Sequence, residues 1–219
     1  MMYLREDWQT PTYASVRGGF GDGLVTLAKQ DDRVVALSAD LVASVGFGKF
    51  AEHIGAPRLI EVGVAEQNLV TVASGLAAMG NIPFAASYAS FSPGRNWEQI
   101  CTTICLNNQP VKVVGSHAGL NVGPDGATHQ MLEDIALMRS LPNMVVLAPG
   151  DAYEAKLMAA VMATDSRPNY VRLPRADMPL FLNQATFEIG KSYTLRQGTD
   201  VALLGTGTMT YQLLLAAEI

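Results

Sequence analysis

The chain has 219 residues, 49% of them hydrophobic and 16% charged, which is enough apolar material for the core of one large globular domain. Its net charge of -5 and the lack of any basic run argue against an extended nucleic-acid surface. No stretch approaches the roughly 18 consecutive apolar residues of a membrane span. The first ten residues also lack the apolar core of a secretory signal. We therefore expect a cytoplasmic protein with neither nucleic acid nor membrane as a partner.

The first half of the chain predicts alternating helices and strands. Residues 12–30 repeat large apolar side chains from Val16 to Leu27 at helical spacing, although four glycines weaken this helix. The Gly-Asp-Gly triplet at 21–23 lies inside the helical pattern and no suitable Asn pair follows it, so we do not assign it to a metal-diphosphate motif. Strands are expected over residues 33–38, 59–64 and 82–88, and helices over residues 66–80 and 96–107.

The second half continues this alternation and then changes in texture. Strands are expected over residues 111–115, 144–148 and 170–173, and helices over residues 129–140 and 151–163. From residue 184 onward we expect an edge ribbon over 186–195, a strand over 201–207 and a helix from about residue 210. Strands that alternate with longer helices predict an α/β fold with a doubly wound, mostly parallel sheet covered on both faces.

Two cysteines, Cys101 and Cys105, lie four residues apart in an expected helix. No histidine or third cysteine accompanies them at a spacing typical of metal ligands. We therefore expect core thiols rather than a metal site.

Residues 59–80 form the unit around which the rest of the chain is organised. A short apolar run ends at Ala-Glu-Gln-Asn, and a helical pattern follows, so a strand passes through a tight junction into a helix. Such junctions build ligand sites at the carboxyl edge of open α/β sheets. Glu66 lies at this junction. Taken by position alone, Glu66 could simply complement the positive end of the helix.

The loop over residues 116–130 is the second polar feature. Pro124, Asp125 and Gly126 have the chemistry of a turn, but His117 and His129 flank that turn where a strand passes into a helix. A His-Asp-His trio is one way to bind a metal. Hydrogen bonding to a polyhydroxylated substrate, with the histidines as donors, acceptors or proton carriers, is the interpretation that we favour.

Several motifs together resemble the pyrimidine-binding domain of the transketolase family. They are Glu66 within Gly-Val-Ala-Glu-Gln-Asn, the aromatic pair Tyr88 and Phe91, and His117 followed by Gly-Pro-Asp-Gly-Ala-Thr-His-Gln at 123–130. The similarity covers about residues 13–173. Residues 91–99, Phe-Ser-Pro-Gly-Arg-Asn-Trp-Glu-Gln, are most similar to the C-terminal subunits of split transketolases.

The resemblance implies thiamine diphosphate as cofactor, in a site shared by two polypeptides. In this family a glutamate at the position of Glu66 hydrogen-bonds N1' of the aminopyrimidine and so activates the cofactor. Phe91 would stack on the aminopyrimidine with Tyr88 beside it, and Val64 would support the folded cofactor from below. Asp40 matches a position near the cofactor. Core packing at a strand end is the alternative for the two aromatic residues.

The resemblance also implies a sugar-phosphate substrate. Four residues match the positions that hold the substrate phosphate: Arg17, Ser44, His117 and Arg172. An arginine fork suits such an oxyanion, although surface ion pairing is the alternative for both arginines. His129 is implied as a catalytic residue at the C1 hydroxyl region of the donor, and Asp125 as a ligand of the C2 hydroxyl. Arg95 departs from the synthase branch of the family by one inserted residue, so we leave it out of the site.

A partner subunit is implied by what this sequence does not contain. The Gly-Asp-Gly...Asn-Asn signature of the diphosphate-binding domain is absent, so Mg²⁺ (or Ca²⁺) would be held by that partner, and no metal site is assigned here. We expect residues 1–183 to form the pyrimidine-binding domain. Residues 184–219 would form a linker, the edge ribbon and the truncated beginning of the family's third domain. Self-association to a dimer or heterotetramer is expected through an apolar edge that carries Tyr88, Phe91 and Met131.

Three functions remain open at this stage. The first is a transketolase subunit that transfers a two-carbon ketol unit between sugar phosphates. The second is another thiamine diphosphate enzyme, either of the 1-deoxy-D-xylulose-5-phosphate synthase type or a 2-oxo-acid dehydrogenase β subunit. The third is a truncated, non-catalytic assembly partner.

Overall fold

A six-stranded parallel sheet forms the centre of the computed structural model, which describes residues 3–219. The strand order is β3-β2-β4-β5-β7-β6, so successive crossovers run to both sides of β2 and β4 and the sheet is doubly wound, as predicted. The strands are β2 (Val34–Ser38), β3 (Leu59–Glu61), β4 (Ile82–Tyr88), β5 (Lys112–Ser116), β6 (Val145–Leu147) and β7 (Asn169–Arg172).

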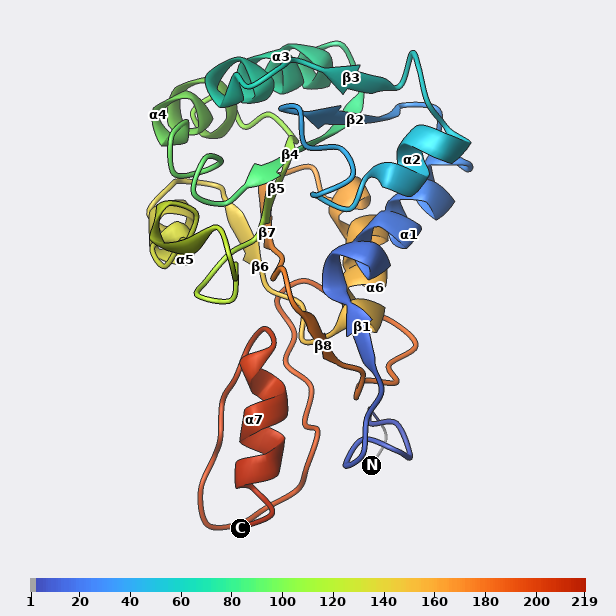
Figure 1. The fold of residues 1–219 in the computed structure, drawn as a ribbon, viewed down its shortest axis with the longest axis vertical. Helices are drawn as coiled ribbons and strands as arrows, with labels where there is room; N and C mark the ends of the chain where they lie inside the picture. The colour runs from blue at the N-terminus through green and yellow to red at the C-terminus, as the bar shows by residue number, and fades with distance from the viewer. Residues whose placement is uncertain (1–2) are drawn as a thin grey trace.

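Helices cover both faces of this sheet (Figure 1). One face carries α1 (Val16–Ala28), α2 (Gly48–His53) and α6 (Ala152–Thr164). The other carries α3 (Glu66–Ala78), α4 (Trp97–Gln99), the π-helical turn η1 (Ile100–Cys105) and α5 (Asp134–Arg139). Alternate residues of β2 supply the two cores: Val34 and Ala36 pack on the α1 side, Val35 and Leu37 on the α3 side.

The glycines of α1 have a packing role. A Cβ atom on Gly19 would collide with the carbonyl oxygen of Ala152, and one on Gly23 with that of Lys156. The helix therefore accepts poor intrinsic propensity because its backbone lies directly against α6. The Gly-Asp-Gly triplet lies within α1, where the sequence pattern placed it.

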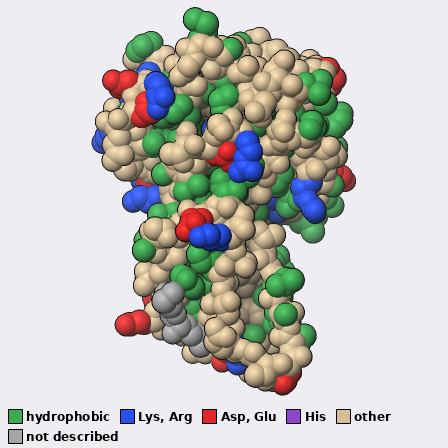
Figure 2. All heavy atoms as spheres, turned by 180° about the vertical axis from the view of Figure 1, so that it is seen from behind, with side chains coloured by type: hydrophobic (Ala, Val, Ile, Leu, Met, Phe, Trp, Pro, Cys, Tyr) green, Lys and Arg blue, Asp and Glu red, His purple; other side chains and the backbone are tan. Residues whose placement is uncertain are grey.

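The chain termini lie together below the sheet (Figure 1). Strand β1 (Tyr13–Ser15) pairs antiparallel with β8 (Asp177–Pro179), and α7 (Met209–Ala216) follows a long irregular segment. A small core joins these parts, formed by Leu4, Trp8, Phe181, Leu182, Tyr211 and Leu214. Seen from behind, the molecule has a broad upper body and a narrower lower part (Figure 2). Within residues 3–219, no helix is long and apolar enough to cross a bilayer.

Several local expectations were wrong. No ladder forms over residues 186–195 or 201–207, so the expected edge ribbon and final strand are absent from the described chain, although α7 begins close to the expected position. A strand needs a neighbour to satisfy its backbone groups, and these segments have none. The helix expected over 129–140 shortens to α5 because Met131 forms a bridge with Gly119 and holds the first residues out of the helix. Helix α2 and strand β1 were not predicted.

Candidate functional site

The parallel sheet gathers the predicted site residues along its carboxyl edge. The strands end close to the following residues: β2 at Asp40, β3 at Val64 and Glu66, β4 at Tyr88 and Phe91, β5 at His117, and β7 at Arg172. The crossovers change direction between β2 and β4, which is where ligands bind in open α/β sheets. Glu66, Tyr88 and Phe91 surround this position.

Glu66 is the first residue of α3 and is almost completely buried, with 2% of its surface exposed. Its Oε1 accepts a hydrogen bond from Ser87 Oγ at 3.2 Å. Its backbone carbonyl oxygen accepts another from Nδ2 of the buried Asn96 at 2.7 Å. A glutamate that only complemented the helix dipole would gain enough from a solvated position. The enclosure of this carboxylate therefore favours a chemical role.

Aromatic rings form a continuous wall beside Glu66. The rings of Tyr88 and Phe91 are nearly parallel, 13° apart, with centroids 6.2 Å from each other. His117 stacks on Tyr88 at 3.7 Å, and His129 meets Phe91 edge-on at 5.3 Å. Tyr88 and Phe91 are only partly buried, and nearby Val64 is 72% exposed. An exposed apolar side chain next to open aromatic faces is suited to a flat ligand rather than to core packing.

Arg95 belongs to the site, although the sequence analysis excluded it. Its Nη1 donates to Oε2 of Glu66 at 3.2 Å, and its Cζ lies 4.8 Å from the centroid of the Phe91 ring. The inserted residue before Arg95 is accommodated in a turn that follows Phe91 and leads into α4. A four-residue spacing from Phe91 was the available signal, because a tight turn can return such a residue toward the ring.

A cluster of cationic residues lies at the other end of the aromatic wall. Arg17 donates to the carbonyl oxygen of Ser44 and, through Nη2, to that of Arg175 at 3.1 Å. The Nε of Arg17 is buried without a partner. The Arg175 guanidinium lies 3.0 Å from where a Cβ of Gly123 would stand, so it faces the loop that contains Asp125. The sequence analysis missed Arg175, whose signal was the second arginine in Arg-Leu-Pro-Arg at 172–175.

His117 links the aromatic wall to the cationic cluster. It is 3% exposed and has a φ of 57°, an unusual conformation for a residue with a Cβ. Burial, followed by the charges of Arg17 and Arg175, lowers the pKa of His117 to about 4. The imidazole is therefore neutral near pH 7, and its Nδ1 lies 2.8 Å from Ser116 Oγ. Backbone strain at a site edge is a common feature of functional positions.

Arg172 has a different environment from the other arginines. Its Nε donates to Oδ2 of Asp134 at 2.9 Å, and the hydroxyl of the buried Tyr170 donates to the same oxygen at 2.8 Å. Asp134 is fully buried and its Oδ1 has no partner. The carboxylate thus holds Arg172 in one orientation, with Nη2 close to the backbone of Gly119.

The remaining candidates lie on the rim. Asp40, with a φ of 62°, is exposed, and its N–H donates to Oε1 of Glu61 at 3.3 Å. Asp125 is exposed in its turn, and His129 Nδ1 lies 2.8 Å from Thr128 Oγ1. Met131, which we expected on an exposed apolar edge, is instead buried with Ala89 and Ala118. That expectation was wrong because the Gly119 bridge draws Met131 inward.

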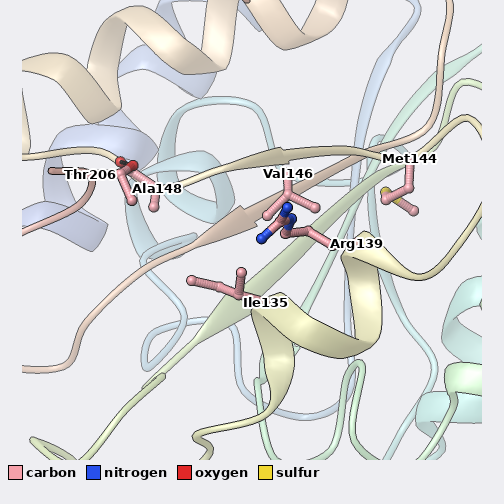
Figure 3. A pocket seen from close by; sticks show the side chains of 6 residues that line it. All are labelled: Ile135, Arg139, Met144, Val146, Ala148 and Thr206. Atoms are coloured by element: carbon pink, nitrogen blue, oxygen red, sulfur yellow. Dashed lines mark hydrogen bonds between the residues drawn. The ribbon is translucent and has the colours of Figure 1, made fainter. Parts of the chain in front are cut away.

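Other features carry no comparable chemistry. A hollow of about 470 Å³ lies beside β6 at the outer edge of the sheet (Figure 3) and shares no residue with the carboxyl-edge site. Its wall is apolar apart from Arg139 and Thr206. The described residues contain no group of three or more His, Cys, Asp or Glu side chains able to hold a metal. Cys105 is buried, Cys101 is partly buried, and both are free thiols.

Comparisons with known proteins agree with this geometry. The family described as "Transketolase, pyrimidine binding domain" matches residues 12–179. A putative transketolase C-terminal section of Methanocaldococcus jannaschii is 43% identical over 210 residues, which cover 94% of this chain and 66% of that protein. A 1-deoxy-D-xylulose-5-phosphate synthase of Syntrophus aciditrophicus is 39% identical over 210 residues, covering 94% of this chain and 31% of that enzyme.

A solved structure is similar over the same extent. A split-gene transketolase, described as an inactive β4 tetramer, superposes with a TM-score of 0.85 at 39% identity, covering 94% of this chain and 67% of that one. The chain therefore spans just under two thirds of the Methanocaldococcus relative and about a third of the synthase.

Proposed function

Because the chain belongs to the transketolase family through its pyrimidine-binding domain, we propose that it is one subunit of a thiamine diphosphate-dependent transketolase. This subunit transfers a two-carbon ketol unit from a ketose phosphate to an aldose. The observation that carries the proposal is the enclosed Glu66 carboxylate at the start of α3, next to the partly open Phe91 ring.

The residues present fit the aminopyrimidine half of the cofactor. When bound, thiamine diphosphate supplies the carbon nucleophile that accepts the ketol unit. Glu66 holds a proton at N1' of the aminopyrimidine, Phe91 stacks on the ring, and Val64 supplies an apolar support at the same edge. Tyr88 and Asp40 flank this position. The enclosure of Glu66 excludes water from its carboxyl group, which strengthens the hydrogen bond.

The cationic cluster is suited to the substrate phosphate. Arg17 and Arg175 lie together without a carboxylate bonded to either, so their charges are available to an oxyanion. Neutral His117 donates a hydrogen bond from the end of the aromatic wall, and Ser44 and Arg172 complete the phosphate site. His129 and Asp125, on the rim, bind the C1 and C2 hydroxyl groups of the donor.

The diphosphate and its Mg²⁺ (or Ca²⁺) are assigned to a separate N-terminal subunit. The described residues of this chain offer no cluster of metal ligands. Two chains of this kind with two diphosphate-binding subunits would form a heterotetramer, with closed two-fold symmetry as the common outcome for such assemblies. Residues 184–219, with α7, are assigned to a linker and the beginning of the family's third domain.

A second candidate reaction is the formation of 1-deoxy-D-xylulose 5-phosphate. The 39% identity to a synthase of that name supports it. The two reactions differ in product, so incubation of the reconstituted enzyme with each substrate set separates them. A non-catalytic assembly role is the remaining alternative, and it predicts no turnover on either set.

The test of the proposal is the substitution Glu66→Gln in the enzyme reconstituted with its partner subunit. Loss of an essential proton-transfer group should lower kcat by at least about 10²-fold while the fold persists. The matched control is Glu61→Gln, which removes an exposed carboxylate from the same sheet edge and should leave kcat within about twofold. Retained activity in Glu66→Gln contradicts the cofactor assignment.

A further inference from the structure

Arg95 makes the two contacts that the proposed function assigns to the aminopyrimidine ring. Its guanidinium donates to Oε2 of Glu66 at 3.2 Å. The same group lies over the Phe91 ring, with Cζ 4.8 Å from the centroid. A planar, delocalised group with N–H donors thus meets a carboxylate at its edge and an aromatic ring at its face.

We propose that Arg95 occupies the aminopyrimidine position in the cofactor-free chain and must be displaced before the cofactor binds. This inference rests on the proposed function, since it uses Glu66 and Phe91 as ligands of the cofactor. One carboxylate oxygen and one face of a ring cannot serve the guanidinium and the pyrimidine together. Arg95 is therefore an internal competitor at this site.

The surroundings of Arg95 allow such a displacement. Its side chain is 51% exposed, whereas that of Glu66 is 1% exposed, so the arginine can move into solvent and the glutamate cannot. The base of the turn is fixed, because Asn96 is fully buried and donates to Ser92 Oγ at 3.1 Å as well as to the Glu66 carbonyl oxygen. The displacement thus needs side-chain rotation and leaves the backbone in place.

The competition also has an energetic basis. In the free chain Arg95 neutralises a carboxylate that is removed from water, which is a stronger interaction than an exposed ion pair. A ligand that takes Glu66 must break this pair, and its observed affinity is reduced accordingly. Removal of Arg95 removes this cost.

The experiment is a titration of the full chain with thiamine, which carries the aminopyrimidine without the diphosphate. Wild type, Arg95→Ala and Arg95→Lys are compared by calorimetry and by ligand-observed NMR. Loss of one charge-assisted competitor should lower Kd for thiamine by about tenfold in Arg95→Ala. Arg95→Lys should lie between wild type and Arg95→Ala, since lysine keeps the charge but not the planar stacking group.

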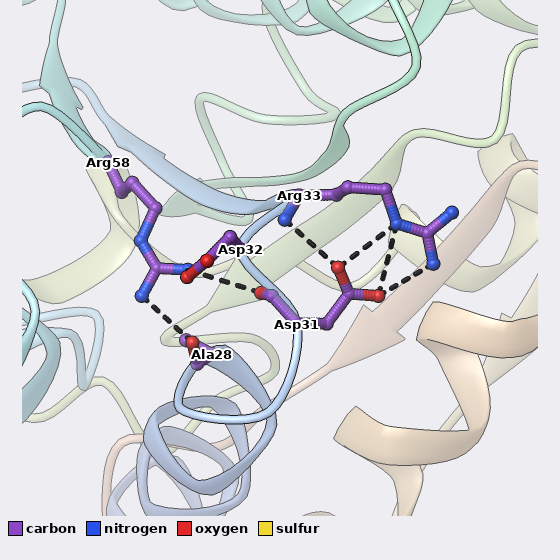
Figure 4. A network of polar contacts seen from close by, with 5 residues as sticks. All are labelled: Ala28, Asp31, Asp32, Arg33 and Arg58. Carbon is purple, nitrogen blue, oxygen red and sulfur yellow. Dashed lines mark hydrogen bonds and ion pairs between the residues drawn. The ribbon is translucent and has the colours of Figure 1, made fainter.

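The matched control is Arg33→Ala. Arg33 is also an exposed arginine paired with a carboxylate, that of Asp31, at 2.6 Å (Figure 4). It lies directly before β2, at the amino end of the sheet, and its removal should leave the thiamine Kd unchanged.

A second measurement follows Arg95 directly. The side-chain NMR signals of Arg95, assigned with Arg95→Lys, should move to the values of a solvated arginine when wild-type chain is saturated with thiamine. Unchanged signals, or unchanged, weaker or undetectable binding in Arg95→Ala, overturn the inference. Failure of the proposed function would differ, because Glu66→Gln and Phe91→Ala would then leave thiamine binding unaltered.

Discussion

The titration of His117 offers a direct test of the site geometry. The ring is 3% exposed, stacks on Tyr88 at 3.7 Å and lies near the charges of Arg17 and Arg175. Burial and these two charges lower its pKa from 6.5 to about 4 in the folded chain. Between these values the unfolded chain binds more protons than the folded one, so the stability is complete above pH 6.5 and is lost as pH falls toward 4.

The size of this loss follows from the two pKa values. A difference of 2.5 pKa units corresponds to about 3 kcal/mol in the limit below pH 4. At pH 5 the unfolded chain is almost fully protonated at this residue and the folded chain is not, and the loss is about 2 kcal/mol. This is a substantial part of the 5–15 kcal/mol typical of a domain, at roughly that order of magnitude.

The assay compares urea unfolding at pH 7.5 and pH 5 for wild type, His117→Asn and His53→Asn. Asparagine tolerates the positive φ at position 117, so the first variant removes the ring without adding backbone strain. His53 is exposed in the last turn of α2 and provides the control. His117→Asn should show the smaller loss of stability at pH 5, by about 2 kcal/mol. An imidazole signal of His117 that titrates near pH 6.5 in the folded chain would refute the reasoning.

Four further predictions follow from the same structure. Arg172→Ala and Arg175→Ala should each raise KM for phosphorylated sugars by an amount equivalent to roughly 1.5–3 kcal/mol, and equal losses with unphosphorylated substrates would show a structural role. Calorimetry should find weak or no binding of thiamine diphosphate by the lone chain and tight binding with the partner subunit; Mg²⁺-dependent binding by the lone chain near about 1 µM would defeat the shared site. Burial lowers the pKa of Lys112 to about 8, so stability should increase as pH rises from 8 to 10.5, and this slope should disappear in Lys112→Met unfolding curves. Asp151→Ala removes four backbone N–H acceptors and the cap of α6, so it should cost about 3 kcal/mol and speed hydrogen exchange at residues 181–182, whereas unchanged exchange there would contradict this role.

Local patterns in the sequence were sufficient for most of the sheet and for the core of the site. Strand β4 was predicted with its observed bounds, and α3 began at Glu66 as expected. These elements are recognisable because their apolar residues recur with the period of the structure itself. Parallel strands then bring their carboxyl ends to one edge, so the positions of Glu66, Phe91 and His117 along that edge follow from order in the chain.

The segments without a partner could not be predicted in this way. Residues 201–207 have the composition of a strand and form none, because a strand depends on a neighbouring backbone and the described chain provides none there. Residues 129–133 have a helical pattern, but the bridge between Gly119 and Met131 uses their backbone first. In both cases the outcome depends on contacts with residues distant in the sequence.

The sequence by itself determined the fold class, the family and the candidate carboxylate, since each depends on residue types in a fixed order. The tertiary structure alone decided which cations meet which groups. Arg95 reaches Glu66 across 29 positions, and Arg17 reaches the Arg175 carbonyl oxygen across 158. It also decided that Arg172 pairs with Asp134. Side chains on a flexible stem can reach several partners, and only the packed backbone determines which partner lies within hydrogen-bonding distance.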